Sequence, residues 1–210
     1  MKVVVLGAAG GIGRHVVTQA LEAGHSVTAL LRDPGKLTLR HERLAIVRGD
    51  VLDGETVRSA IVGHDAVVSA MGVRDRAPTT LYSEGARNTL TAMTAEGIRR
   101  YIAISASGFH RDANDPFLLR YLGKPIISQL LKEHYADLIR MESIVASSDR
   151  DWTIVVPPRL TDGPRTGRYR EALDVNVRNG LSISRADVAD YIVKGLAKSA
   201  PQQALAFIAY

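Results

Sequence analysis

The segment that most constrains the fold lies at residues 2–14, where a short apolar run passes directly into a glycine-rich turn. The run Val-Val-Val-Leu is typical of a central parallel strand that is buried on both faces. Gly7, Gly10 and Gly13 follow at the spacing G-x-x-G-x-x-G, and glycine lets a phosphate group approach the backbone without a Cβ in the way. A helix that starts near Gly11 would direct its free N–H groups at that phosphate. The segment therefore predicts a phosphate- or dinucleotide-binding turn, with an ordinary tight turn as the alternative.

The composition is that of an ordinary globular protein and disfavours several kinds of site. With 210 residues, the chain fits one domain, 1–210, with a sizeable core. It contains no cysteine, so we expect no disulfide, no cysteine nucleophile and no thiolate metal site. We also predict no other metal site. The first predicted strand begins at Lys2 and no apolar run is long enough to span a membrane, so we expect a cytoplasmic protein without a signal peptide.

The formal net charge of +5 comes from basic residues that are scattered along the chain rather than gathered in one block. Arg99 and Arg100 form only a pair. We therefore expect a solvated surface that also attracts an anionic cofactor or a small-molecule substrate, and neither a nucleic acid nor a membrane as partner. The chain is expected to be a monomer or a homodimer.

Strand and helix patterns alternate from the start of the chain, which is typical of a parallel sheet with crossover helices. The predicted strands are 2–6, 26–31, 44–48, 65–70, 100–105 and 152–157. The predicted helices are 11–23, 54–61, 81–96, 125–148 and 185–197, and a last apolar segment, Ala204 to Ala209, predicts a closing edge strand. This order predicts an α/β fold. It is a single doubly wound parallel sheet (Rossmann fold) with a small C-terminal substrate-covering region and a ligand crevice at the carboxyl ends of the strands.

Two segments do not fit the alternation. Residues 109–124 leave the end of a strand before Pro125 opens a helix, and residues 157–182 are rich in Pro, Gly, Thr and Arg and lack a helical period. Because both follow strand ends, both are predicted to cover the crevice and to set substrate specificity. The alternative is that either is an ordinary surface excursion.

The end of the second strand indicates which cofactor binds. In a dinucleotide-binding unit this position lies beside the adenosine ribose, where an acidic residue binds the 2′-hydroxyl and an arginine accommodates a 2′-phosphate. Arg32 is the first polar residue after the strand, and Arg14 follows the third glycine. Two guanidinium groups suit a phosphate, so we predict NADPH as cofactor. Asp33 could instead bind the hydroxyl, which would favour NAD.

The third and fourth strands end in residues that suit the rest of a dinucleotide. Asp50 could accept a hydrogen bond from the adenine amino group while Val51 packs on the ring; alternatively Asp53 caps the next helix and Asp50 only shapes the turn. Small residues after the fourth strand would let the backbone pass close to the diphosphate. The predicted contacts from the turn and the strand ends are Gly7, Ala9, Gly10, Gly11, Ile12, Gly13, Arg14, Arg32, Asp50, Val51, Ala70, Met71, Gly72 and Ser105.

The fifth strand ends in two serines, Ser105 and Ser107, which share one face if the strand geometry persists that far. A hydroxyl here could orient a nicotinamide amide or donate a hydrogen bond to a substrate oxygen. We therefore take both as candidate catalytic residues. The alternative is that they are small residues that close a strand.

Several motifs together resemble the short-chain dehydrogenase/reductase superfamily. The chain is most similar to its atypical branch, which contains flavin reductase/biliverdin-IXβ reductase and the NmrA-like NAD(P)-binding proteins. The residues that carry the resemblance are the glycine spacing, Arg32, Gly49-Asp50-Val51, Ser83 to Asn88, Val155 to Pro158, Thr166 to Tyr169 and Ser184 to Ala189. The resemblance implies NADPH in an extended form, with Pro157, Pro158 and Arg159 near the nicotinamide. It also implies hydride transfer to flavins, linear tetrapyrroles or quinone-like acceptors.

The chain departs from the superfamily in its proton-donating groups. No Tyr-x-x-x-Lys pair follows the fifth strand, and His134 and Leu138 stand where that tyrosine and lysine would be. Ala106 takes the place of the active-site serine of the reductases that the chain resembles. His134 is therefore a candidate general acid, because an imidazole titrates near neutral pH; the alternative is a helix histidine with no chemical role. His110 is a similar candidate.

Three functions are compatible with these residues. The first is an NADPH-dependent reductase of a planar conjugated acceptor, which needs little acid from the protein because the acceptor delocalises the incoming electrons. The second is a non-catalytic NmrA-like sensor that binds NADP. The third is a cofactor-recycling epimerase or dehydratase, which we disfavour because the sequence marks no strong base near the crevice.

Overall fold

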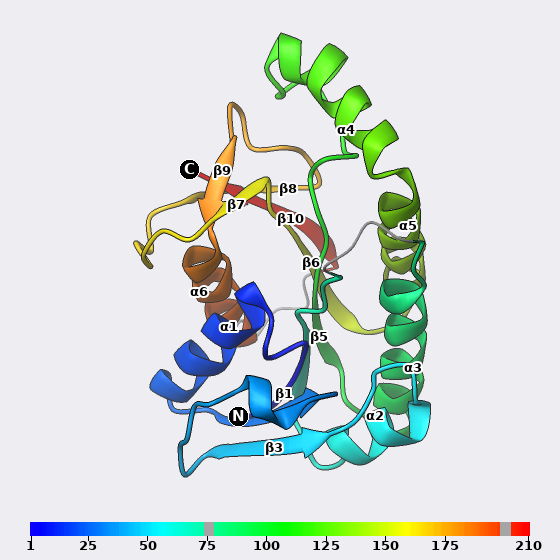
Figure 1. The fold of residues 1–210 in the computed structure, drawn as a ribbon, viewed down its shortest axis with the longest axis vertical. Coiled ribbons are helices and arrows are strands. Elements are labelled where there is room, and N and C mark those ends of the chain that lie inside the picture. The colour runs from blue at the N-terminus through cyan, green and yellow to red at the C-terminus, as the bar shows by residue number, and fades with distance from the viewer. Residues whose placement is uncertain (74–77, 198–202) are drawn as a thin grey trace.

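The computed structural model describes residues 1–73, 78–197 and 203–210. A large sheet forms the middle layer and helices cover both of its faces (Figure 1). The helices are α1 (Gly11–Glu22), α2 (Gly54–Ile61), α3 (Leu81–Ala95), α4 (Lys124–Leu130), α5 (Lys132–Ala146) and α6 (Arg185–Leu196), with short helical turns η1 (Pro34–Lys36) and η2 (Leu119–Gly123). The strands are β1 (Lys2–Leu6), β2 (Ser26–Leu31), β3 (Leu44–Arg48), β4 (Ala66–Ser69), β5 (Arg100–Ile104), β6 (Asp151–Val156), β7 (Arg159–Thr161), β8 (Arg170–Leu173), β9 (Ser182–Ser184) and β10 (Ala204–Ala209).

The eight-stranded sheet has the order β3-β2-β1-β4-β5-β6-β10-β8. All neighbours are parallel except β8, which runs antiparallel to β10. The order reverses between β1 and β4, and this reversal opens a crevice at the carboxyl ends of the strands. The structure thus confirms the predicted α/β fold with a doubly wound, mostly parallel sheet.

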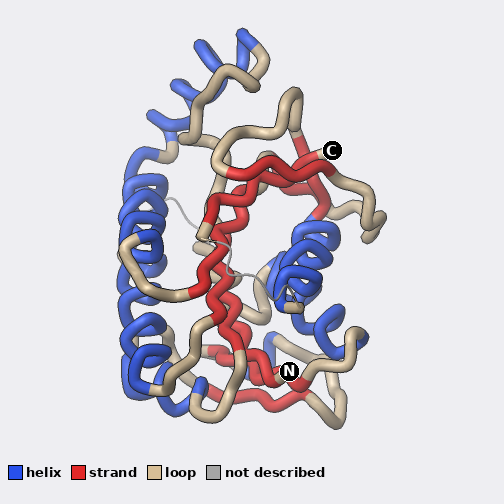
Figure 2. Tube along the Cα trace, turned by 180° about the vertical axis from the view of Figure 1, so that it is seen from behind, coloured by secondary structure: helices blue, strands red, loops and turns tan. Residues whose placement is uncertain are grey.

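Each face of the sheet has its own apolar core. Helices α2, α3 and α5 pack on one face, and α1 and α6 pack together on the other, as Figures 1 and 2 show from opposite sides. Val3, Val4, Val5 and Leu6 of β1 have no exposed surface, because their side chains alternate between the two cores. The first apolar run therefore forms the central strand that the sequence predicts.

The predicted bounds of the first five strands and of most helices agree with the structure to within a residue or so. One prediction at the C-terminal end is wrong. Residues Ala204–Ala209 do not form the edge of the sheet, because β10 lies between β6 and the additional strand β8. The sequence Arg-Glu-Ala-Leu of β8 carries no alternating pattern, and charged residues of this kind are common on edge strands.

The predicted helix 125–148 is also corrected. It divides at Leu131, whose backbone lies at φ −111° and ψ 23°, into α4 and α5. Pro125 does lie in the first turn of α4, but the helical conformation already starts at η2, inside the segment predicted as irregular. The two pieces η2 and α4 extend beyond the body of the molecule (Figure 1).

Segment 157–182 is fastened to α6 by two buried carboxylates. Asp187 accepts hydrogen bonds from the backbone of Thr166 at 2.8 Å and from the Tyr210 hydroxyl at 2.6 Å. Asp190 pairs with Arg165 at 2.6 Å. Burial alone would raise the pKa of Asp187, but the hydrogen bonds from Tyr210 and Thr166 outweigh it and hold the pKa below its usual value. The segment is thus held in place by side chains that are about 20 residues away in sequence.

Within the described residues, no helix is long and apolar enough to cross a membrane. No group of three or more His, Cys, Asp or Glu side chains in that part of the chain could hold a metal ion.

Candidate functional site

The glycine-rich turn between β1 and α1 is packed so closely that side chains are excluded from it. Gly7 has a φ of +75°, and a Cβ placed on it would lie 2.5 Å from the carbonyl oxygen of Ala70. A Cβ on Gly13 would lie only 2.2 Å from the carbonyl oxygen of Gly7. The bare backbone leads directly into α1, whose N-cap residue Gly10 provides no side-chain cap. The N–H groups of the first turn therefore face a cradle without side chains, which fits the diphosphate of a dinucleotide.

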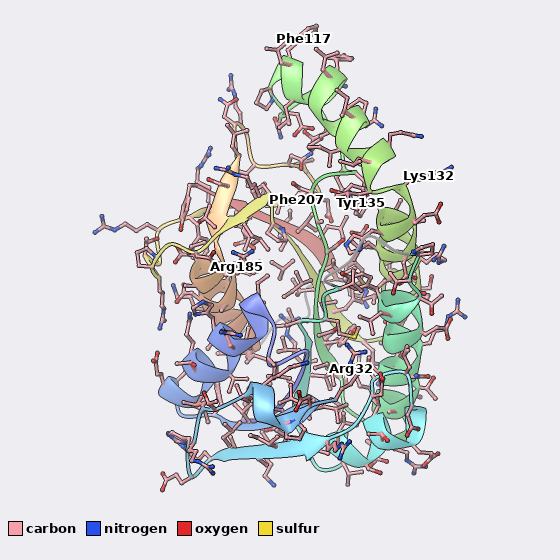
Figure 3. The ribbon with its side chains drawn as sticks, in the orientation of Figure 1. Arg32, Phe117, Lys132, Tyr135, Arg185 and Phe207 are labelled. Carbon is pink, nitrogen blue, oxygen red and sulfur yellow. The ribbon has the colours of Figure 1, made fainter. Side chains whose placement is uncertain are left out.

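An arginine from the far end of the chain lies over this cradle. A Cβ on Gly11 would meet Cδ and Nε of Arg185 at 2.8 Å, so the side chain of Arg185 occupies the space beside the first residue of α1. One guanidinium nitrogen of Arg185 lies 2.6 Å from Oδ1 of the exposed Asp162. Figure 3 shows Arg185 between α6 and α1. Sequence reasoning missed Arg185 as a cofactor residue because only the packing of α6 on α1 brings it to the turn.

The two arginines predicted to bind a 2′-phosphate have different surroundings. Arg14 donates from Nη2 to the carbonyl oxygen of Ala9 at 3.1 Å. Arg32 follows the end of β2, is exposed, and makes no hydrogen bond or ion pair to any described residue (Figure 3). Asp33, the alternative ribose ligand, accepts from the backbone N–H of Gly35 at 3.1 Å and caps η1. The guanidinium of Arg32 is thus available to an anion, while the carboxylate of Asp33 is used by the turn.

At the end of β3 the acidic residues shape the turn. Asp50 accepts from the backbone N–H of Leu52 at 3.0 Å, and Asp53 caps α2 through the backbone N–H groups of Glu55 and Thr56. The sequence allows two interpretations of this turn, and these contacts are those of the second, in which Asp53 caps the helix and Asp50 shapes the turn. Val51 is buried, and its carbonyl oxygen accepts from Asn88 at 3.0 Å. The backbone here is held firmly, as an adenine site requires.

The segment after β4 runs along the same edge of the sheet as the turn. Ala70 and Met71 are buried, and Ala70 donates its N–H to Leu6 at 2.9 Å. The sulfur of Met71 would lie 2.9 Å from a Cβ on Gly85, so the absence of a side chain on α3 makes room for Met71. No atom of the described residues lies within 4 Å of a Cβ on Gly72. These residues thus leave open space beside the glycine turn.

Ser105 is linked to a histidine through a carboxylate that the sequence does not connect with either of them. Its hydroxyl donates to Oε1 of Glu142, which projects from α5. Nε2 of His110 lies 3.0 Å from the same carboxylate oxygen, and the side chains of His110 and Glu142 are mostly buried. A buried carboxylate that contacts both a hydroxyl and an imidazole can orient both groups and can hold or accept a proton. The sequence does not identify Glu142 as a site residue, because it is 37 positions from Ser105. The one local signal is its position beside the apolar stripe of its helix.

A row of aromatic rings extends from α5 to β10 at the carboxyl end of the sheet. The ring of Tyr135 lies 5.1 Å from that of Phe109, Phe109 lies 4.3 Å from His110, and His110 lies 5.2 Å from Phe207. Figure 3 shows Tyr135 and Phe207 on either side of the chain that leaves β5. Burial raises the pKa of Tyr135, so its hydroxyl stays protonated.

The hollow beside this row contains several of the predicted residues. Ser107 and Pro158 line it together with Asn176 and Phe207. Pro157 accepts the backbone N–H of Ser107 at 3.0 Å, which continues the pairing of β5 with β6. Arg159 is exposed and begins β7 opposite Ser182 of β9. The structure therefore brings two of the predicted residues, Ser107 and Pro158, together at this hollow. Ser107 rather than Ser105 faces it.

His134 lies in a different set of contacts. Its Nε2 is 3.4 Å from the hydroxyl of Tyr82, which in turn accepts the backbone N–H of Val73 at 3.3 Å. Burial lowers the pKa of His134, although Asp137 acts against it. His134 thus stands beside the segment that follows β4, whereas Ser105, after β5, contacts Glu142, which in turn contacts His110.

The two predicted substrate-covering segments are joined to each other. Asn114 donates to the carbonyl oxygen of Asn176 at 3.0 Å, and the backbone N–H of Asn176 donates to Asp112. Lys124 forms a buried ion pair with Asp115 at 2.6 Å and also donates to the carbonyl oxygen of His110. His110 is therefore held by its backbone as well as by Glu142.

The doubly wound sheet, the bare glycine cradle and the exposed arginine beyond β2 define a dinucleotide-binding protein of the Rossmann class. The chain belongs to the NAD(P)H-binding family, whose model matches residues 7–199. NAD(P)H is therefore the cofactor class that this site serves.

The individual proteins that the chain resembles share its fold, but their names refer to different activities. The Bacillus subtilis protein YhfK, named as an uncharacterized sugar epimerase, is 29% identical over 204 residues, which cover 93% of this chain and 88% of YhfK. A Streptococcus pneumoniae structure, SP1627, whose name assigns it provisionally to the NADH-flavin reductases, has a TM-score of 0.82 at 24% identity over 100% of this chain and 99% of its own. A short-chain dehydrogenase/reductase from Veillonella parvula, in complex with NADP, has a TM-score of 0.81 at 18% identity over 100% of this chain and 94% of its own. The solved structures establish the fold and the family match establishes the NAD(P)H-binding family, whereas the reaction belongs to the proposal below.

Proposed function

We propose that this protein is an NADPH-dependent reductase that transfers a hydride to a planar conjugated acceptor, such as a flavin, a quinone or a tetrapyrrole-like compound. The observation that carries the proposal is the pair of partly exposed rings Phe109 and His110, 4.3 Å apart, which pack against the buried rings of Tyr135 and Phe207 at the carboxyl end of the sheet. Partly exposed aromatic side chains suit a flat apolar ligand, because such a ligand can pack on their ring faces and edges.

On the cofactor side, each part of the dinucleotide has a residue to receive it. The N–H groups of the glycine turn and the guanidinium of Arg185 would bind the diphosphate. Arg32, together with Arg14, would bind the 2′-phosphate and so select NADPH over NADH. Pro157 to Arg159 would lie near the nicotinamide, as in the reductases that the chain resembles.

Bound NADPH supplies the hydride, and the chain's own residues position the acceptor and provide a proton. The partly exposed rings of Phe109 and His110 would hold the acceptor in place, which is the main contribution to the rate when the acceptor itself delocalises charge. Glu142 orients the imidazole of His110 through the 3.0 Å contact between its carboxylate and Nε2. His110 can then transfer a proton to the reduced acceptor and recover it from water.

The proposal is tested by the near-ultraviolet absorbance of NADPH in the presence of a panel of flavins and quinones. Steady oxidation that depends on both enzyme and acceptor supports the reductase. Tight binding of NADPH without oxidation over the whole panel would contradict it and would favour a non-catalytic NADP-binding sensor.

A second candidate is a cofactor-recycling epimerase or dehydratase. It is favoured by one observation, the Glu142–His110 pair, which supplies the base that the sequence does not mark. YhfK carries an epimerase name, which is compatible with this chemistry. Incubation with sugar nucleotides and catalytic NADP+ in deuterated water distinguishes the two, because an epimerase that acts through this base exchanges a substrate proton without net consumption of cofactor.

A further inference from the structure

The helical arm made of residues 117–130 carries an apolar surface that nothing in the described chain covers. Figures 1 and 2 show that η2 and α4 project beyond the body of the molecule, and Figure 3 places Phe117 at the tip. Seven of the sixteen exposed large apolar side chains in the described part of the chain fall within these fourteen positions. They are Phe117, Leu118, Tyr121, Leu122, Ile126, Ile127 and Leu130.

Four of these side chains form one continuous stripe. Pairs four residues apart, such as 118 with 122, 122 with 126 and 126 with 130, lie on the same side of a helix. Phe117 is 73% exposed, and its ring lies 4.8 Å from that of Tyr121. Exposed apolar patches of this extent are uncommon on monomeric proteins and mark interaction surfaces.

The charges of the arm decide what kind of partner fits. Only Arg120 and Lys124 are charged between residues 117 and 130. Arg120 lies over the ring of Tyr121, 5.3 Å from its centroid, and Lys124 is buried in its ion pair with Asp115. A helix that binds at a membrane surface carries a strongly basic polar face, and a nucleic-acid surface needs exposed cations. The arm has neither, whereas depletion of charge and enrichment of aromatic residues is typical of the core of a protein–protein interface.

The size and the composition of the patch point to a second copy of the chain. Its seven side chains expose roughly 800 Å², about one partner's share of a standard interface. Outside the arm, no stretch of fourteen positions in the described residues contains more than three exposed large apolar side chains. The surface that best complements one arm is therefore another arm, which a two-fold axis places opposite the first.

We propose that residues 117–130 form the interface of a homodimer, with the arms of two copies packed against each other. The arm is prepared for this role because its base is fixed by the Lys124–Asp115 ion pair and by the bonds from Asp112 and Asn114 to Asn176. The proposal does not depend on which reaction the site catalyses.

Sedimentation velocity over a wide concentration range tests the interface. We expect the full chain to sediment at twice its mass of 22.7 kDa. Leu122→Glu with Ile126→Glu should raise the dissociation constant at least about 100-fold, because both residues would lie in the dry centre of the interface. Val62→Glu, an exposed apolar residue at the end of α2, is the matched control and should remain dimeric.

Far-UV circular dichroism and NADPH binding establish that each variant is folded. A monomeric wild-type chain at all concentrations would overturn the proposal. So would a dimer that the double variant leaves intact, which would place the interface elsewhere. Co-sedimentation of the wild-type chain with vesicles of anionic and neutral phospholipids, lost in the double variant, would assign the arm to a membrane surface instead.

Discussion

Replacement of Gly13 by alanine tests the packing of the cofactor turn. The new Cβ would lie 2.2 Å from the carbonyl oxygen of Gly7, whereas ordinary contact begins at 3.4 Å, so the two atoms must move apart by about 1.2 Å. Both partners are backbone, so α1 must shift relative to β1. Such overpacking costs about 1–3 kcal/mol of stability. It also moves the N–H groups of α1 away from the diphosphate; the loss of one hydrogen bond to a charged group, about 1.5–3 kcal/mol, weakens binding roughly 10- to 100-fold.

The assay is isothermal titration with NADPH, together with a thermal melt of each variant. Gly195→Ala is the control, because a Cβ at Gly195 on α6 would meet its neighbours at 3.5 and 3.6 Å, within ordinary contact. The control should bind NADPH as the wild type does. If Gly13→Ala remained folded and bound NADPH with unchanged affinity, the turn would not hold the diphosphate. An unchanged melting temperature would refute the close packing itself.

Three further predictions follow from other contacts. Arg185→Ala should weaken NADPH about tenfold or more in calorimetry and leave the affinity for adenosine 2′-phosphate unchanged, because that fragment lacks the diphosphate beside Gly11; equal losses for both would contradict the assignment. Glu142→Gln should lower the turnover of an acceptor and alter its pH profile at unchanged NADPH affinity, because His110 loses the carboxylate that orients it; an unchanged profile would exclude a role for the pair. The depressed pKa of Asp187 means that its contribution to stability is present above the unfolded value and is lost as the pH falls through the lower, folded value. The melting temperature of Asp187→Asn should therefore depend less on pH in the acid range than that of the wild type, and parallel curves would contradict this.

Most strands and helices can be predicted from the sequence because their apolar residues recur with a regular period. The run at residues 3–6 and the apolar patterns of the later elements place the first six strands and most of the helices to within a residue or so. The strands β7, β8 and β9 have three or four residues each, too few to show a period. The division at Leu131 carries no glycine or proline that would mark a helix end. These elements depend on tertiary contacts, such as those of Asp187, that the local sequence does not contain.

The candidate site likewise contains one part that the local sequence identifies and another that only the tertiary packing brings together. The glycine turn is local, so its spacing alone identifies it. Glu142 and Arg185 reach their partners only through the packing of α5 and α6, across 37 positions in the first case and 174 in the second. The predicted cofactor contacts and the roles of Ser105, Ser107 and His134 are still predictions, as are the one-domain organisation, the crevice-covering role of the two segments and the cytoplasmic location.

The most direct test of the central claim is the affinity of the protein for NADPH and for NADH, measured by isothermal titration on the wild type and on Arg32→Glu. Arg32 makes no hydrogen bond or ion pair to any described residue, so the substitution removes a cation without breaking a contact in that part of the chain. The account predicts that the wild type binds NADPH more tightly than NADH, and that the variant loses affinity for NADPH at least about tenfold more than for NADH. Equal responses of the two cofactors, or tighter binding of NADH by the wild type, would contradict the assignment of the 2′-phosphate to Arg32.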